Sequence, residues 1–492
     1  MKVPELRRRI LFTLAMIVVV RLGVQIPLQG IAVMELQKLI VASTNASGPG
    51  AGLATVLTIF SGGGLQQCGI FALGIMPYIS ASIMTQLLSA VVPQWAKMVR
   101  EEGGRQKMTK WTRAIAIVIA LVQGWFLVGT LEHPERLQAV GLNIPADCQL
   151  VIDPGIQFAL MTVLIMVAGT MFLMWIGDQI TERGVGNGVS LIISVNIIHA
   201  LPGAVTLAWK TLVYKDGAVV PMGAMLLVAL IAFLIVVVAL VVTVTQAQRR
   251  IPVQYAKRVM GNKMFNGATQ YLPLKLNYSG VMPVIFATAI LSLPQVLFSQ
   301  IAHYNTTLQW IATKMNDWLN PASSGYYIIS GLMIFFFSYF WVATMFQPSQ
   351  IAEDLKRNGG YIPGIRPGPP TALFLDQTMQ RLTFAGSAFL TLIYFLPSLL
   401  NIGGNIPYLV TQFFGGTSLL ILVGVLLDMM RQVETTLLSR NYDGFLKKGK
   451  LKGKYGHIQG TGAAAGSRTV TVMWIVIALL VLAGAIAYNA MQ

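Results

Sequence analysis

Long apolar runs separated by short polar segments dominate the chain. Eleven runs approach the roughly 20 residues that an α-helix needs to cross a bilayer. They cover about residues 10–27, 71–91, 114–131, 156–176, 189–209, 221–245, 281–302, 326–346, 378–399, 407–430 and 469–488. Backbone groups in lipid must be satisfied within each segment, and an alternating barrel pattern is absent, so the runs are predicted to be helices. The pattern predicts an all-α polytopic membrane protein.

The polar segments differ in charge on the two sides of the membrane. With the N-terminus placed inside, 29 of the 35 Lys and Arg residues lie on the inner side and five on the outer side. This bias follows the positive-inside rule and predicts a cytoplasmic N-terminus. A basic inner face could also hold anionic lipid or ribosomal RNA. Arg21 is the only charge deep in a run, and a long side chain near a helix end is expected to snorkel toward the membrane surface.

Motifs for catalysis and for metal binding are missing from the sequence. It has no GxxxxGK[ST] loop, and the segment GTGAAAG at 460–466 follows no strand, so we interpret it as a linker. The four histidines lie in four different regions, and paired intramembrane carboxylates are absent. We therefore expect a non-catalytic protein without a metal or cofactor. Cys68 and Cys148 both fall in outward-facing stretches, where two unpaired thiols are favoured over a disulfide.

Two kinds of connection between the runs are candidates for function. The segment LATVLTIFSGGGLQQ at 53–67 is too short to span and is predicted to be a re-entrant piece lining a cavity; a helix lying on the outer surface is the alternative. The inner loop 246–280 carries six basic residues and no acid, and the next inner loop ends in a Pro- and Gly-rich tip with Arg366. Such loops either only fix the orientation or dock a partner, and the stiff tip favours docking.

Six long motifs, in this order and spacing, resemble the SecY family of protein-conducting channels. They are FSGGGLQQCGIFALGIMPYISASI, GTMFLMWIGDQITERGVGNGVSLI, QRRIPVQYAKR, LPLKLNYSGVMPVIF, GGYIPGIRPG and FGGTSLLILVGVLLDMMRQVE, and the resemblance covers about residues 5–455. It implies a ten-helix channel of two inverted five-helix halves in the bacterial cytoplasmic membrane. Such a channel passes unfolded polypeptides and releases membrane helices sideways into lipid.

The resemblance also implies roles for particular residues. It implies a pore ring of Ile75, Ile79, Ile193, Ile285 and Ile421, and a plug that includes Leu53, Val56, Phe60, Ser61, Gly62, Gly63 and Gly64. A polar cluster at a lateral gate would comprise Ser80, Gln123 and Asn277. Docking of a motor or ribosome would use Arg249, Arg250, Lys257, Arg258, Lys263 and Arg366. The implied partners are the membrane subunits SecE and SecG, the ATPase SecA, the ribosome, and signal peptides and nascent polypeptides.

The implied pore ring of five isoleucines would form an apolar collar, which suits a channel that must hold back ions. Isoleucine is stiff at χ1, and an apolar constriction excludes ions by dewetting.

The division of the chain follows from the number and spacing of the runs. We expect an N-terminal half at 1–212, a C-terminal half at 213–432, a basic linker at 433–468 and an additional membrane helix at 469–489. The additional helix departs from the family pattern. A polytopic secondary transporter is the alternative, because it also explains inverted halves and broken helices. It would need a polar or charged substrate pocket rather than a collar.

Overall fold

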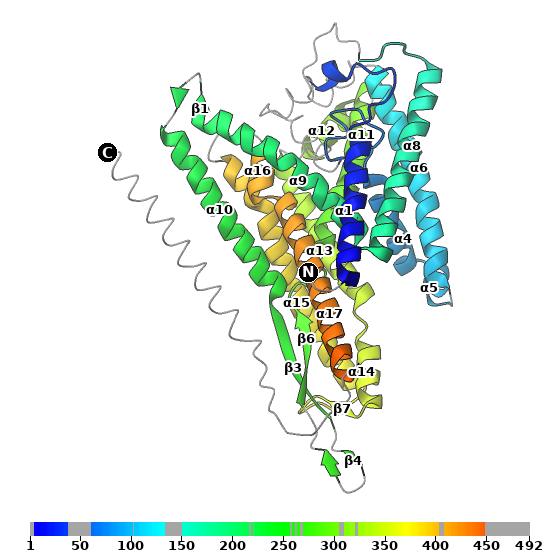
Figure 1. The fold of residues 1–492 in the computed structure, drawn as a ribbon, viewed down its shortest axis with the longest axis vertical. Helices are drawn as coiled ribbons and strands as arrows, with labels where there is room; N and C mark the ends of the chain where they lie inside the picture. Colours follow the sequence, from blue (N-terminus) through cyan, green and yellow to red (C-terminus); the bar gives the residue numbers. More distant parts are fainter. Residues whose placement is uncertain are drawn as a thin grey trace.

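The fold is a bundle of long helices with a small β-sheet at one end (Figure 1). The computed structural model describes residues 4–37, 61–101, 103–132, 150–215, 218–219, 221–255, 258–260, 263–265, 269–304, 309–319, 323–402 and 408–447. The predicted eleventh run at 469–488, most of the predicted linker and Cys148 lie outside these residues.

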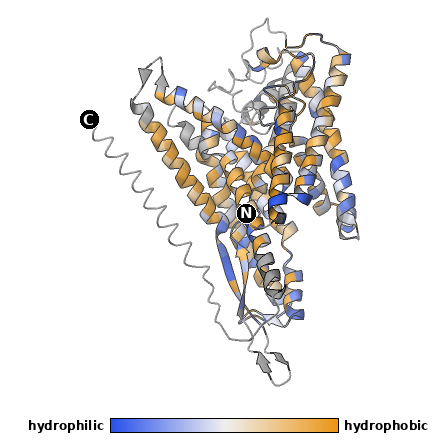
Figure 2. Ribbon diagram, in the orientation of Figure 1, coloured by the Kyte–Doolittle hydropathy of each residue, from blue (hydrophilic) through white to orange (hydrophobic). Residues whose placement is uncertain are grey.

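Helices coincide with the first ten predicted runs. They are α1 (Pro4–Val24), α4 (Met76–Val91), α6 (Gly104–Glu132), α8 (Ile156–Arg183), α9 (Gly188–Ala208), α10 (Pro221–Gln246), α11 (Met282–Tyr304), α13 (Ser324–Met345), α15 (Pro369–Ile402) and α17 (Thr417–Lys447). In the described residues, seven helical segments are long and apolar enough to cross a membrane. Hydrophobic residues follow the helices of the bundle, and hydrophilic residues gather toward its ends and on the sheet (Figure 2). The prediction of a helical membrane protein is confirmed.

The tenth predicted run is two helices rather than one. α16 (Tyr408–Gly415) ends at a bend at Gly416, and α17 begins at Thr417. A Cβ added at Gly416 would overlap Gln412 Oε1, so only glycine fits there. The Thr417 hydroxyl donates to the same Gln412 Oε1 at 3.3 Å, which gives this buried amide oxygen a partner at the break.

Shorter elements connect the long helices. A π-helical segment, η1 (Trp209–Val213), follows α9 and leads to the hairpin of β1 (Tyr214–Lys215) and β2 (Ala218–Val219). The remaining helices are α5 (Pro93–Arg100), α12 (Gln309–Leu319) and α14 (Pro348–Arg357). α5 and α14 lie toward the end of the bundle that carries the sheet (Figure 1). Both come from segments predicted to be cytoplasmic, so this end is the predicted inner side.

The predicted inner loop 246–280 contains β-strands that were not expected from the sequence. β3 (Gln248–Tyr255) pairs antiparallel with both β6 (Thr269–Lys275) and β7 (Gly360–Tyr361), and β4 (Arg258–Met260) pairs with β5 (Lys263–Phe265) beyond them. Ile251 and Val253 on β3 are buried while Arg250 and Pro252 are exposed, the alternation of a half-buried strand. These side chains and Leu274 form a small core with Phe346 and others at the inner ends of α13 and α15.

The inner end of α17 is tied to two other parts of the bundle. Gln432 Oε1 accepts a hydrogen bond from the Gly186 backbone at 2.8 Å, in the turn between α8 and α9. Arg431 donates to the Thr245 carbonyl of α10 at 3.1 Å. Because α17 also packs along α9 and α10, these three helices form one continuous wall.

Candidate functional site

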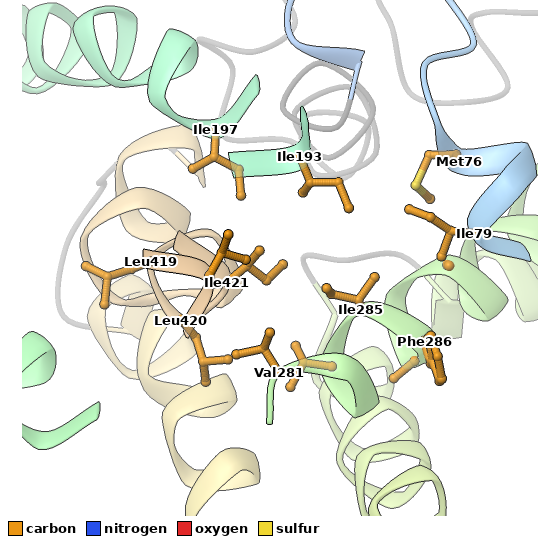
Figure 3. Close-up of a cluster of buried hydrophobic side chains, with 14 of the residues drawn as sticks. Met76, Ile79, Ile193, Ile197, Val281, Ile285, Phe286, Leu419, Leu420 and Ile421 are labelled. Carbon is orange, nitrogen blue, oxygen red and sulfur yellow. The ribbon is translucent and has the colours of Figure 1, made fainter. Parts of the chain in front are cut away.

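The five isoleucines of the predicted ring lie in one apolar cluster at the centre of the bundle. Ile75, Ile79, Ile193, Ile285 and Ile421 are between 0% and 4% exposed and belong to the same buried cluster. Figure 3 shows Ile79 from α4, Ile193 from α9, Ile285 from α11 and Ile421 from α17 converging on a common centre. The structure therefore brings together side chains that are up to 346 positions apart in the sequence.

Each of the four helices contributes to this cluster from its beginning. Ile79 and Ile285 lie in the first turn of α4 and α11, and Ile421 and Ile193 lie within the first two turns of α17 and α9. Ile75 immediately precedes α4 as its N-cap residue. A helix start fixes the direction of its first side chains, so the ring is set by where the helices begin rather than by their middle sections.

The starts of α4 and α11 have the same local sequence and geometry. The residues are Gly-Ile-Met-Pro at 74–77 and Gly-Val-Met-Pro at 280–283. Gly74 has φ +60° and Gly280 has φ +65°, a backbone conformation that favours glycine. Proline then occupies the second helical position in both, where its missing N–H costs no hydrogen bond.

Further apolar side chains, beyond the predicted isoleucines, complete the cluster. Figure 3 places Met76, Ile197, Val281, Phe286, Leu419 and Leu420 around the isoleucines. A Cβ added at Gly424 would overlap a Val281 methyl group, so α17 and the start of α11 are in close contact. Part of the signal for these residues was present, because Met76, Phe286 and Leu420 are direct neighbours of predicted isoleucines.

A cavity lies next to the cluster on the side of the β-sheet. Its volume is about 260 Å³, and Val281 and Gly424 line the wall that it shares with the apolar cluster. Lys275, Asp428 and Arg431 line the same cavity. Burial lowers the pKa of the Lys275 ammonium below its ordinary value, and nearby Arg431 lowers it further while Asp428 opposes the change. The cavity thus has charged side chains in its lining and ends at the apolar side chains of the central cluster.

Only part of the predicted plug lies in the described residues. Leu53, Val56 and Phe60 fall outside them, whereas the backbone from Ser61 onward is described and runs through turns to Ile75. Ser61, Gly62, Gly63 and Gly64 are all buried, and Gly62 and Gly63 have φ of +64° and +85°. A Cβ at Gly62 would overlap the Asn196 side chain, so this segment contacts α9 more closely than any other residue type would permit.

The expectation that Arg21 snorkels to the membrane surface is wrong. Its guanidinium turns inward and donates to the Gly62 carbonyl at 3.0 Å, the Val195 carbonyl at 2.8 Å and Asn196 Oδ1 at 2.9 Å. These acceptors lie on the predicted plug segment and on α9. Three fixed hydrogen bonds within the protein replace the water that a snorkelling side chain would seek.

The three predicted gate residues lie on or beside helices that pack together. Ser80 is on α4, Gln123 is on α6, and Asn277 is in the loop before α11; α4 packs against both α6 and α11. Ser80 Oγ is buried and has no hydrogen-bond partner in the structure. Asn277 bonds within its own loop, donating to the Gly280 carbonyl at 3.0 Å and accepting from Ser279 Oγ at 3.1 Å. Within the described part of the chain, no hydrogen bond joins the three residues to one another.

The predicted docking residues are distributed over the sheet and its surroundings. Arg249 and Arg250 are exposed on β3, and Arg366 is exposed in the turn after β7, between Gly364 and Gly368 with φ of +83° and +110°. Arg258 lies on β4 and Lys263 on β5, at the far tip of the hairpin (Figure 1). Lys257 lies outside the described residues. The pairing of β7 with β3 places two separate inner loops on one surface.

Comparison with known proteins gives one family. The SecY family model matches residues 69–430. The protein translocase subunit SecY of Streptomyces coelicolor is 41% identical over 91% of this chain and 98% of its own length, and that of Chlamydia trachomatis is 40% identical over 92% and 98%. The SecY of Thermotoga maritima is 38% identical over 92% of this chain.

Solved structures agree on the fold. A protein-conducting channel of known structure matches with a TM-score of 0.58 at 17% identity, over 89% of this chain and 94% of its own. A SecY structure solved to show how its plug domain stabilises the closed channel matches equally well. Sec61 from the canine ribosome–channel complex matches with a TM-score of 0.55 at 18% identity, over 89% of this chain and 94% of its own. The predicted channel fold is thereby confirmed, and the chain belongs to the SecY family.

Proposed function

We propose that this protein is a membrane channel that passes unfolded polypeptides and releases apolar segments sideways into lipid. One observation carries the proposal: five isoleucines, four on separate helices and Ile75 directly before α4, belong to one buried collar, and a cavity with charged side chains ends against it. The relatives named above are translocase subunits, and the structural neighbours are protein-conducting channels.

The collar would seal the resting channel by dewetting. An apolar constriction offers ions no substitute for their hydration shell, so conduction requires the collar to widen around a chain. The buried polar side chains among the described residues are Ser, Thr, Asn and Gln, with no buried charge. A carrier would need a polar or charged substrate pocket, so this distribution does not favour the secondary transporter.

The segment that contains Ser61–Gly64 would act as the plug on the other side of the collar. It is buried, it lies against α9 next to the helix turn that carries Ile193, and it is held by backbone contacts that a side chain would disrupt. Leu53, Val56 and Phe60 would belong to the same plug. A plug of this kind adds a second barrier to the apolar collar.

The seam between α4 and α11 would be the lateral gate. Both helices begin after a glycine with positive φ, and Ser80 leaves a buried hydroxyl without a partner beside the seam. An unpaired polar group in a membrane interior gains from any new partner. A polar group of a passing chain, or a rearrangement of Asn277 or Gln123, could supply one and bias the seam toward opening.

The energy for translocation would come from a partner that docks on the basic sheet. The exposed Arg249, Arg250 and Arg366 lie on one surface, and Arg258 and Lys263 belong to the β4–β5 hairpin at its tip. We assign Lys257 to the same docking set from its place in the sequence. Charges on a solvated rim steer a partner more than they stabilise the fold. We assign this surface to the ATPase SecA or a ribosome, expect no catalytic activity in this chain, and expect SecE and SecG as membrane partners.

The setting would be the bacterial cytoplasmic membrane, with the N-terminus inside. The positive-inside bias carries this orientation, and the two halves at 1–212 and 213–432 would be inverted repeats meeting at the collar. Residues 469–489, after the linker at 433–468, would add a further membrane helix. Labelling of a cysteine after residue 489 from the outer side only would support this helix, whereas labelling from the inner side would contradict it.

A crosslinking experiment tests the proposal as a whole. A cysteine introduced at Ile285 should crosslink to a stalled secretory chain, because any chain in transit must pass the collar. Leu332 on α13 is exposed on the surface of the bundle, away from the buried collar. A cysteine at this position is the matched control and should not crosslink to a fully secretory chain. Crosslinking at Leu332 but not at Ile285 would place the path outside the collar and reject the proposal.

A further inference from the structure

Arg21 joins three parts of the chain through a single side chain. It lies in the last turn of α1. Its Nη1 donates to the Gly62 carbonyl at 3.0 Å, and its Nη2 donates to the Val195 carbonyl at 2.8 Å and to Asn196 Oδ1 at 2.9 Å. Two of the three bonds therefore reach α9, and the third holds the buried segment Ser61–Gly64.

The acceptors on α9 are placed where that segment touches the helix. A Cβ added at Gly62 would overlap Asn196, and a Cβ added at Gly63 would lie 3.3 Å from His199 Nε2. Asn196 and His199 are three residues apart and thus on one face of α9. The same face therefore receives both the glycine backbone and the guanidinium that holds it.

The bond to Gly62 differs from the other two in what it fixes. α1 already packs against α8 and α9 through apolar side chains such as Val20 and Val24, which are in the central cluster. The bonds to Val195 and Asn196 fix the guanidinium itself on α9. The bond to Gly62 instead restrains a glycine-rich segment that has few side chains of its own to pack.

We propose that Arg21 is a positioning residue that latches Ser61–Gly64 onto α9 in the resting channel. This inference rests on the proposed channel function, in which that segment is the plug. When the segment leaves, the bond from Nη1 to the Gly62 carbonyl breaks, while the two bonds from Nη2 keep the guanidinium in place. The segment then returns to the same fixed donor, which sets its resting position.

The test measures how often the latched segment becomes accessible. Ser61 is buried, so a cysteine at this position, with Cys68→Ala and Cys148→Ser in the same full-length protein, reports release through its rate of reaction with a membrane-impermeant maleimide. The variants are Arg21→Gln, which removes the charge, and Arg21→Lys, which keeps a charge but cannot hold three acceptors in a fork. Arg8→Gln changes an exposed arginine on the same helix and is the control.

Arg21→Gln should raise the labelling rate at least about tenfold, the factor expected from one lost hydrogen bond to a charged group. Arg21→Lys should fall between Arg21→Gln and the parent, and Arg8→Gln should match the parent. If Arg21 had a purely structural role, Arg21→Gln would have a lower melting temperature than the parent. Its labelling rate, measured well below that melting temperature, would then equal that of the parent. A rise of less than about threefold in a folded Arg21→Gln protein would overturn the proposal.

Asn196 variants keep the test decisive if Arg21→Gln fails to fold. Asn196→Asp preserves an acceptor for Arg21 and should label no faster than the parent. Asn196→Ala removes that acceptor and should label faster; equal rates for the two variants would overturn the latch.

A separate arm of the experiment adds a stalled secretory chain to the parent protein. Failure of that chain to enter would count against the channel function, whereas failure of the Arg21 arm alone would count against the latch.

Discussion

Ile79 and Ile285 occupy the same position in two helices that begin with the same kind of sequence. Each follows by three residues the methionine that begins its helix, in Gly-Ile-Met-Pro and Gly-Val-Met-Pro. The two helices pack against each other, and both isoleucines are buried in one cluster. The two parts of the chain thus contribute equivalent side chains to the collar through equivalent backbone geometry, which supports an internal repeat.

Replacing Ile79 and Ile285 together with serine should open an ion leak in the resting channel. Two hydroxyls in the collar would stabilise a file of water and remove the dewetted barrier. Single-channel conductance in planar bilayers measures the effect. The control replaces two exposed outer-face leucines, Leu160 and Leu332, with serine and should leave the membrane tight. An unchanged conductance in the collar variant would remove these isoleucines from the seal.

Ser80→Ala and Asn277→Ala should differ in their cost to stability. Ser80 Oγ has no partner, so its loss should change the free energy of unfolding by less than about 0.5 kcal/mol. Asn277 both donates and accepts near the start of α11, and its loss should cost about 1–2 kcal/mol. Thermal unfolding of the purified variants in detergent makes the comparison. A larger loss for Ser80→Ala would mean that its hydroxyl has a partner in the membrane.

Charge reversal on the sheet should block partner-driven export without unfolding the protein. Arg249→Glu with Arg250→Glu, and separately Arg366→Glu, change exposed side chains, and such changes usually alter stability by less than about 0.5 kcal/mol. Export into inverted vesicles with SecA and ATP measures the loss. Arg357→Glu, on the nearby α14, is a control for a general change of inner charge. Normal export by the sheet variants would place docking elsewhere.

Lys275→Gln should change how stability depends on pH. The pKa of Lys275 is lowered in the folded protein from 10.5, mainly by burial, so between the lowered pKa and 10.5 the unfolded state binds more protons. Stability contributed by this group therefore rises with pH across that window. Melting temperatures between pH 7 and 11 should show a smaller rise in Lys275→Gln than in the parent or in Lys356→Gln, an exposed control. Identical profiles would contradict the assignment.

The long helices and the collar were predictable from the sequence for different reasons. Apolar runs identify membrane helices because lipid requires them, and helices are found at each of the first ten runs. The isoleucines were assigned only through the resemblance to the SecY family, because an isolated apolar residue gives no sign of which cluster it joins. Ile193 and Ile421 lie on helices whose packing depends on contacts hundreds of residues apart.

Three features were missed because local signals were weak or ambiguous. The alternation of Ile251 and Val253 in β3 spans only a few residues inside a basic loop, where charge is the stronger signal. The bend at Gly416 lies in a Gly-Gly pair, which is a loop signal, but apolar residues flank the pair on both sides and the whole stretch was interpreted as one run. The inward turn of Arg21 depends on Gly62 and Asn196, which lie 41 and 175 residues away, and no sequence pattern indicates that they meet there.

The wall made by α9, α10 and α17 has a consequence for the direction in which we expect the collar to widen. Gln432 and Arg431 fasten that wall at its inner end, so the side of the ring that carries Ile193 and Ile421 is anchored. The side that carries Ile79 and Ile285 has instead two helices that begin at glycine turns and meet at a seam. We therefore expect dilation to be asymmetric: a polypeptide wider than the resting aperture would displace α4 and α11, and one of its sides would then face the bilayer along that seam.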